Sequence, residues 1–264
     1  MGSSHCKVEA TTECRRKDNN LQTTSKVCEI FECWPLLKHP KGYDLIEIDY
    51  ASLKLITIEL SVKNWFVFYA NLQKICPIRK DDNNAESLNQ LLQLENLTDD
   101  SRIFLQLRIL PHMIPPKGRI RGSKNQWKPS ISECKDSIIV HAVVSADTIN
   151  IQERRREVMK KLGLTLQPFI IVVGPTLSEI SSFYVCVDKV LYKVPSVLKA
   201  LEICFKCFHV LNAVYPPESE HLWLLLQRSL FMFSTKWDKM APYIMEIITE
   251  LSNLDKDNNE QRKE

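Results

Sequence analysis

The sequence predicts an α+β protein whose small mixed sheet, a βαβ unit plus a β-hairpin, is flanked by helices. Two continuous runs rich in β-branched residues, Ile138–Val144 and Pro168–Val173, enclose the charged helical stretch Asp147–Leu162. This order is typical of a βαβ unit, whose parallel strands are buried on both faces. The next two segments, Ser182–Val187 and Val190–Val194, alternate around a polar turn and predict a β-hairpin.

An α-rich segment is expected before the sheet. Within it, Val27–Asp49 predicts a turn followed by a short strand, Asp44–Ile48. The helix expected over Ile58–Ile75 carries bulky residues on one stripe and ends before Pro77. After a polar loop, another helix is expected over Ala85–Leu94.

Capping residues mark two further helices. Thr98 is a good N-cap for a helix over Asp99–Leu110, which has two acids in its first turn. Pro111 is expected to stop that helix because proline cannot donate a backbone hydrogen bond. Ser130 is the expected N-cap of a short helix over Ile131–Asp136.

The remaining helices follow from the same signals. Gly163 stands where the C-cap of the helix over 147–162 is expected, since glycine enters the left-handed conformation without strain. Apolar residues at helical spacing predict that three more helices close the chain. These cover Ser196–Leu211, Glu218–Phe233 and Met240–Leu251.

Patterning divides the chain of 264 residues into four parts. Residues 1–26 and 255–264 show no hydrophobic period and predict disordered tails. Between them lie an α-rich segment, 27–116, and an α+β module, 117–254, which contains the βαβ unit, the hairpin and the last three helices. Because 44% of the residues are hydrophobic, the chain has enough apolar material for a core.

Composition also limits the function classes. Nine cysteines without an apolar secretory signal predict reduced thiols and a cytoplasmic or nuclear location. The longest apolar runs fall far short of the about 20 residues that a membrane helix needs, so no membrane contact is expected. The motifs GxSxG, GxxxxGK[ST], HExxH and GxGxxG do not occur, and neither an enzyme nor a cofactor is expected. Cys204 and Cys207 have a CxxC spacing but lie within an apolar helix, so no metal is expected there.

One long segment has a family resemblance. It begins WKPSISECKDSIIVHA and continues through PFIIVVGPT and FYVCVDKVLYKVPS. The stretch Trp127–Leu251 resembles the C-terminal region of uncharacterised animal proteins, many from arthropods, some of which also carry a sterile alpha motif domain. A weaker echo lies at Trp34–Asp49. The resemblance concerns core residues and turns, so it implies a fold and no catalytic residue.

The strongest functional signal is the segment PPKGRIRGSKNQWKPS. Its charge of +5 exceeds the +3 of the whole chain. A flexible basic segment with an interleaved aromatic suits phosphate contact and base stacking, so it predicts a nucleic-acid or anion site. The candidate residues are Lys117, Arg119, Arg121, Lys124, Trp127 and Lys128. The alternative is a solvated loop that Trp127 anchors to the core.

A second basic cluster lies on the helix over 147–162. Its candidates for the same site are Arg154, Arg155 and Lys161. If this helix lies beside the segment 117–128, the two clusters form one patch. The alternative is an ordinary exposed helix whose charges face water, because apolar residues of the same helix must face the sheet.

The first expectation is therefore a non-enzymatic binding or scaffold protein that contacts nucleic acid or another polyanion. The alternative is a protein–protein interaction module that docks through its C-terminal helices, since these offer more apolar residues than one buried stripe requires. The docking candidates are Leu222, Trp223, Leu226 and Leu230. An enzyme of unknown class is the third interpretation.

Overall fold

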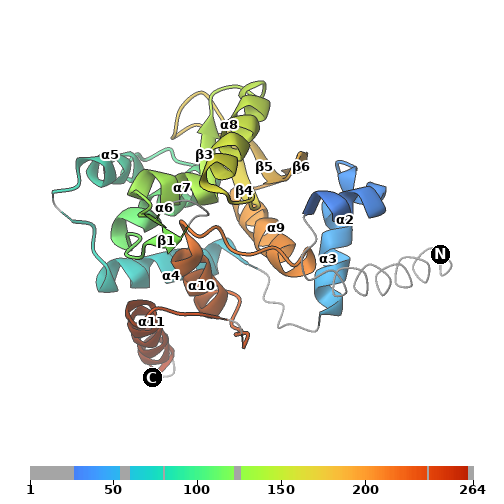
Figure 1. Ribbon diagram of the computed structural model, residues 1–264. Coiled ribbons are helices and arrows are strands. Elements are labelled where there is room, and N and C mark those ends of the chain that lie inside the picture. Colours follow the sequence, from blue (N-terminus) through green and yellow to red (C-terminus); the bar gives the residue numbers. More distant parts are fainter. Residues whose placement is uncertain (1–26, 54–59, 80, 122–125, 237, 261–264) are drawn as a thin grey trace, which may run out of the picture.

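Figure 1 shows the protein as a computed structural model that describes residues 27–53, 60–79, 81–121, 126–236 and 238–260. The fold is α+β, as predicted, with helices around a small mixed sheet. The N-terminal helical elements are α2 (Val27–Cys33), η1 (Pro35–Lys38), α3 (Tyr43–Ser52), α4 (Val62–Ile75), α5 (Asn83–Leu92) and α6 (Asp99–Met113). The later helices are α7 (Ile131–Ile138), α8 (Asp147–Leu162), α9 (Val197–Val210), α10 (Glu220–Ser229) and α11 (Pro242–Glu260).

The sheet has the strand order β3-β4-β5-β6, and its first pair is parallel while the others are antiparallel. Its strands are β3 (Ile139–Ala142), β4 (Phe169–Val173), β5 (Ser182–Val187) and β6 (Val190–Val194). The predicted βαβ unit and β-hairpin are therefore confirmed. A separate two-stranded ribbon is formed by β1 (Ile120–Arg121) and β2 (Gln126–Trp127).

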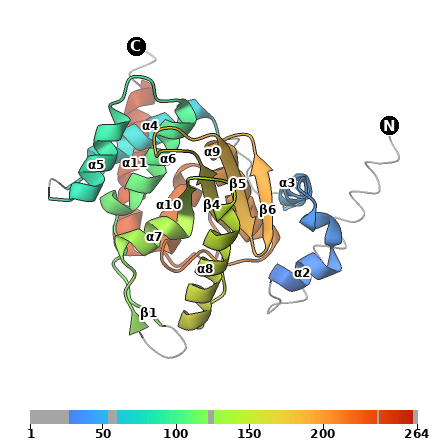
Figure 2. The same cartoon turned by 90° about the horizontal axis from the view of Figure 1, so that it is seen from above.

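Helices cover both faces of this sheet (Figure 2). On one face, Ile170 and Val185 belong to the main core together with Leu201 of α9. On the other face, Phe169 and Ile171 form a small separate cluster against α8. Because both faces are covered, β4 is buried along its whole length, as the continuous apolar run predicted.

Helix α6 lies at the centre of the helical part and contacts α4, α5, α7 and α9. Every residue from Ile103 to Met113 is buried except Arg108, which is half-buried. A polar group in such a helix needs a partner, and Trp65 Nε1 of α4 donates a 2.7 Å hydrogen bond to Gln106 Oε1. The main core joins residues of 27–116 with residues of 117–254, so these two parts share one core.

Helix termini follow the predicted caps. The hydroxyl of Thr98 accepts a hydrogen bond from the backbone of Ser101, and Ser130 forms a complete capping box with Glu133. Gly163 ends α8 with φ of 72°, in the left-handed region. These local contacts explain why the starts of α6 and α7 and both ends of α8 agree with the sequence-based bounds.

The predicted strand Asp44–Ile48 is wrong, because this segment lies within α3. Apolar residues there occur at helical as well as at strand spacing. The helix places Ile46 and Tyr50 on one buried face, and Tyr50 packs edge-on against Phe205 of α9 at 6.4 Å between ring centroids. Tertiary packing on α9 thus selects the helix.

Several predicted helix ends are also wrong, among them that of α10, which ends at Ser229 and not at Phe233. Pro111 lies inside α6, which continues to Met113, and α11 continues to Glu260, so it includes residues 255–260 that we predicted to lie in the C-terminal tail. A proline in the last turn costs one backbone hydrogen bond, and burial of the surrounding residues outweighs that cost. The predicted tail 1–26 lies outside the described residues.

The prediction that α10 offers an exposed docking surface is wrong. All four candidates are buried: Leu222, Trp223, Leu226 and Leu230. Helix α11 packs against α10, and Trp223 lies edge-on against Phe208 of α9 at 4.9 Å between ring centroids. The extra apolar residues are therefore explained by a helix that is enclosed by other helices. Within the described residues, no helix is both long and apolar enough to cross a membrane.

Replacing Trp65 by Phe tests the buried contact between α4 and α6. The change removes the indole donor and leaves the buried Gln106 oxygen unpaired, so we expect the free energy of unfolding to fall by about 1–3 kcal/mol. Urea denaturation followed by circular dichroism measures this loss. The double variant Trp65→Phe/Gln106→Leu removes the unpaired acceptor as well and should recover part of the loss. Unchanged stability of Trp65→Phe would contradict this role of the hydrogen bond.

Candidate functional site

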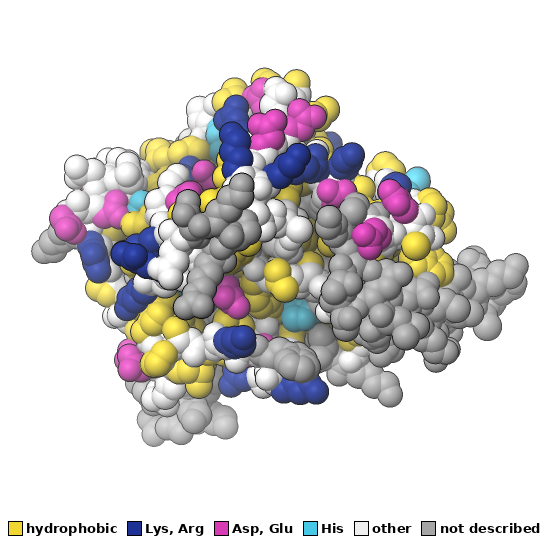
Figure 3. All heavy atoms as spheres, in the orientation of Figure 1, with side chains coloured by type: hydrophobic (Ala, Val, Ile, Leu, Met, Phe, Trp, Pro, Cys, Tyr) yellow, Lys and Arg dark blue, Asp and Glu magenta, His cyan; other side chains and the backbone are white. Residues whose placement is uncertain are grey.

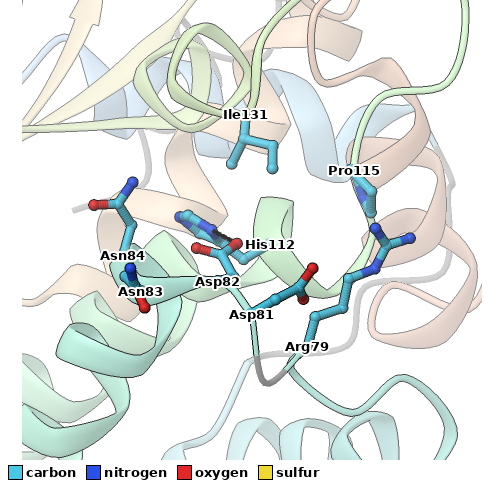
Figure 4. A pocket seen from close by; sticks show the side chains of 8 residues that line it. All are labelled: Arg79, Asp81, Asp82, Asn83, Asn84, His112, Pro115 and Ile131. Atoms are coloured by element: carbon cyan, nitrogen blue, oxygen red, sulfur yellow. Dashed lines mark hydrogen bonds and ion pairs between the residues drawn. The ribbon is translucent and has the colours of Figure 1, made fainter.

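A groove opens where the N-terminal ends of α5 and α7 meet the chain that follows α6. Its central hollow is shown in Figure 4, and the lining residues are Arg79, Asp81, Asp82, Asn83, Asn84, His112, Pro115 and Ile131. The positive ends of two helix dipoles therefore lie at this hollow, where the carboxylates of Asp82 and Glu133 cap them.

Two further hollows continue the groove in both directions. One shares Arg79 and Pro115 with the central hollow and adds Lys117 and Lys128. The other shares Asp82 and His112 and adds Arg108, Lys135 and Leu177. The three have volumes of about 390, 650 and 480 Å³, within the usual range of ligand sites. We call these three adjoining hollows the basic groove.

A hydrogen-bonded pair, Asp82 and His112, lies in the middle of the basic groove (Figure 4). Asp82 is the N-cap of α5, and its Oδ1 accepts a 3.0 Å hydrogen bond from the backbone of Ala85. Its Oδ2 lies 2.6 Å from Nδ1 of His112, whose side chain is only 8% exposed. The pair thus joins the start of α5 to the last turn of α6.

The protonation state of this pair follows from its contacts. Burial raises the pKa of Asp82, but hydrogen bonds from His112 and from the backbone of Ala85 lower it more, so the net pKa lies below its ordinary value. An ionised carboxylate can only accept, so Nδ1 of His112 carries the proton of the shared hydrogen bond. No hydrogen bond to the second nitrogen, Nε2, is found among the described residues, and in the neutral tautomer with the proton on Nδ1 this nitrogen is an acceptor.

Two cations at one end of the groove repel each other. Burial lowers the pKa of Lys135, and the nearby Arg108 lowers it further, while Asp136 at 3.6 Å opposes both effects. Burial also lowers the pKa of Arg108, whose guanidinium carbon lies 5.4 Å from the centroid of the Phe104 ring. A bound anion would relieve this repulsion and raise both pKa values, so this end of the groove favours an anionic ligand.

The structure brings together part of the basic segment predicted from the sequence. Lys117 and Lys128 both line the groove, and the Lys117 ammonium lies 4.1 Å from the centroid of the Tyr243 ring in α11. Arg119 is exposed but does not line the groove. Arg121 lies in β1 with a side chain that is outside the described part, and Lys124 lies outside the described residues altogether.

The position of Trp127 supports the alternative interpretation of this residue. Its ring is half-buried, and Nε1 donates a 3.2 Å hydrogen bond to Oε1 of Glu133. Glu133 also completes the capping box of α7. Trp127 therefore anchors β2 to α7, and among the described hollows it does not line the groove as a stacking platform.

The second basic cluster lies elsewhere. Arg154 and Lys161 are exposed on α8, and no residue of α8 lines the described groove. Figure 3 shows Lys and Arg side chains gathered over α8 with acidic side chains among them. The β1–β2 ribbon and α8 project from the same side of the molecule, at the bottom of Figure 2. The two elements thus lie on one side of the molecule, but the basic clusters do not form one described groove.

The prediction that Arg155 is free to bind an anion is wrong. Its guanidinium carbon lies 4.9 Å from the centroid of the Phe169 ring, and burial lowers the pKa of Arg155. The buried Glu218 opposes this shift. Arg155 therefore packs between α8 and β4 instead of facing solvent.

Sequence reasoning missed most of the groove. The unpredicted residues are Arg79, Asp82, Arg108, His112 and Lys135. Each is a single ionisable residue in an unremarkable local pattern, and the groove assembles them from separate segments. One local signal existed, since the polar run Asp81–Asn84 precedes a helix and suits capping, but nothing in it identifies His112 as the partner.

Other clusters of polar residues have structural roles. His221 Nε2 donates a 3.0 Å hydrogen bond to the carbonyl of Ile114, which holds the chain that forms one wall of the groove. Cys204 and Cys207 are fully buried in α9. Within the described ranges, no three His, Cys, Asp or Glu side chains gather in a way that could hold a metal ion.

Comparison with known proteins assigns neither a family nor a function to this chain. No family model, no curated protein and no solved structure matches this chain. The family resemblance of residues 127–251 stays an expectation from the sequence. The functional inference therefore rests on the residues and geometry of the basic groove.

The link between Asp82 and His112 predicts a pH dependence of stability. Because the folded-state pKa of Asp82 lies below its ordinary value of 3.8, the stabilisation is fully present above that pH and is lost as the pH falls through the folded-state pKa. Asp82→Asn retains a capping side chain but removes the titration. We expect it to be less stable than wild type at pH 7, with a difference that shrinks towards about pH 3. Urea denaturation at several pH values measures this difference. Asp81→Asn is the control, and a difference that is independent of pH would contradict the assignment.

Proposed function

We propose that the protein binds nucleic acid through its phosphate backbone, along the basic groove. The observation that carries this proposal is the convergence of basic side chains from separate segments on one continuous groove. They are Arg79, Arg108, Lys117, Lys128 and Lys135. Among the described residues that line these three hollows, the carboxylates are Asp81 and Asp82.

The chemistry of this surface matches a backbone ligand better than a compact anion. Charges are spread over three adjoining hollows, so a linear ligand meets more of them than a single phosphate can. Arg and Lys contacts with successive phosphates release counterions, which supplies affinity without base recognition. Such a binding role fits the expected cytoplasmic or nuclear location.

The competing proposal, docking of a partner protein through α10, loses its support because the apolar candidates are buried. The exposed cations of α8 remain a second place where a polyanion could make contact. Their acidic neighbours reduce the local charge (Figure 3), whereas cations outnumber carboxylates among the lining residues of the groove. This contrast provides an internal control.

Fluorescence anisotropy tests the proposal with the full chain and labelled single-stranded RNA, single-stranded DNA and duplex DNA. The groove variant combines Arg79→Ser, Lys117→Ser and Lys128→Ser. We expect it to weaken binding and to reduce the slope of log affinity against log salt by about 2–3, since three phosphate contacts are lost.

The matched control combines Arg154→Ser, Lys160→Ser and Lys161→Ser, which removes the same charge from exposed positions on α8. We expect it to change affinity and salt slope much less than the groove variant. Absence of binding by wild type at about 50 mM salt, or an equal loss in both triple variants, would reject the groove as the nucleic-acid site.

A further inference from the structure

The imidazole of His112 lies among the cations that line the basic groove. Three cations, Arg79, Lys117 and Lys128, lie in the central hollow and towards one end, while Arg108 and Lys135 lie at the other end. His112 lines both the central hollow and the end that holds Arg108 and Lys135. A backbone that contacts cations at both ends must therefore pass His112.

The exposed nitrogen of His112 has a defined hydrogen-bonding role. Nδ1–H donates a hydrogen bond to Oδ2 of Asp82 over 2.6 Å, and in this neutral tautomer Nε2 carries a lone pair. This nitrogen has no partner among the described residues, and Figure 4 shows the ring edge away from Asp82 directed into the hollow, towards Asn84. Phosphate oxygens are acceptors, so they cannot satisfy it. A hydroxyl group of the ligand can.

A ligand with a hydroxyl donor between its phosphates can fill this role. The ribose of RNA carries a 2′-hydroxyl beside the phosphodiester, and this group distinguishes RNA from DNA. A deoxyribose at the same position offers no such donor, so DNA cannot form this hydrogen bond. The neighbouring carboxylates Asp81 and Asp82 further disfavour a phosphate at this point of the groove.

We propose that the groove is selective for single-stranded RNA, with Nε2 of His112 accepting a hydrogen bond from a ribose 2′-hydroxyl. The inference rests on the proposed nucleic-acid binding and specifies its ligand. Asp82 is a positioning residue, because it acts through the tautomer and orientation of His112.

The test compares affinities of the full chain for single strands of one sequence in three chemistries: RNA, DNA and 2′-O-methyl RNA. The methylated strand keeps the 2′-oxygen of ribose but has no hydroxyl proton to donate. It therefore distinguishes loss of the hydrogen bond from a change in sugar conformation. For wild type we expect RNA to bind about 5- to 10-fold tighter than either of the others, the net worth of about one hydrogen bond.

Two variants change the acceptor without removing the cations. In Asp82→Asn the amide can donate to Nδ1, which moves the imidazole proton to Nε2 and turns the acceptor into a donor. His112→Phe keeps a ring of similar shape without nitrogen. We expect the ratio of RNA to DNA affinity to fall towards one in each variant whose far-ultraviolet circular dichroism matches wild type.

Asp81→Asn is the matched control, because it removes one negative charge from the groove without touching His112. It should raise the affinities for RNA and DNA alike and keep their ratio. Equal binding of RNA and DNA by wild type, or a preference for RNA that survives in folded Asp82→Asn or His112→Phe, would overturn the proposal. Groove-dependent binding without a preference for RNA would overturn this inference alone, whereas loss of groove dependence would also overturn the proposed function.

Discussion

Burial of α6 on all sides is the constraint on which the rest of the structure depends. Four helices pack around it, and Ile103–Leu107 and Ile109–Met113 are withdrawn from solvent. A helix in that position cannot have a polar outer stripe, so each polar side chain along it needs a specific partner. Gln106 pairs with Trp65 of α4, and Asp100 accepts a 2.8 Å hydrogen bond from the backbone of Val197 at the start of α9. These contacts fix the helical layer against the sheet-bearing part of the chain.

The same constraint produces the groove. At the C-terminal end of α6, His112 pairs with Asp82, so the start of α5 is held against the last turn of α6. His221 of α10 holds Ile114, and the chain that follows carries Lys117 into the groove. The capping box of α7 forms beside it, next to Lys128. The interactions that satisfy buried polar groups at one end of a central helix thus also gather cations along the basic groove.

The sequence predicts the fold where local signals and tertiary packing agree. Helix α8 has the predicted bounds because Gly163 ends it and strands on both sides limit it, and the hairpin follows from alternation around a short turn. It fails at Asp44–Ile48, where only packing on α9 decides between helix and strand. Of the cations in the site, the sequence predicts only Lys117 and Lys128, because these two belong to one short basic segment. Asp82 and His112 are 30 positions apart, so no local sequence pattern predicts their pairing. The contact of Arg155 with the Phe169 ring likewise depends on tertiary packing and not on a local pattern.

The tautomer of His112 tests the central claim most directly, since it reports both the buried pair and its exposed nitrogen. Long-range proton–nitrogen correlation spectra of ¹⁵N-histidine-labelled protein at neutral pH distinguish a protonated from an unprotonated Nε2. We predict a proton on Nδ1 and a bare Nε2, whose nitrogen shift moves when a single-stranded oligoribonucleotide is added and stays in place with the matching DNA. A proton on Nε2 in the free protein, or a resonance that RNA leaves unchanged, would contradict the account.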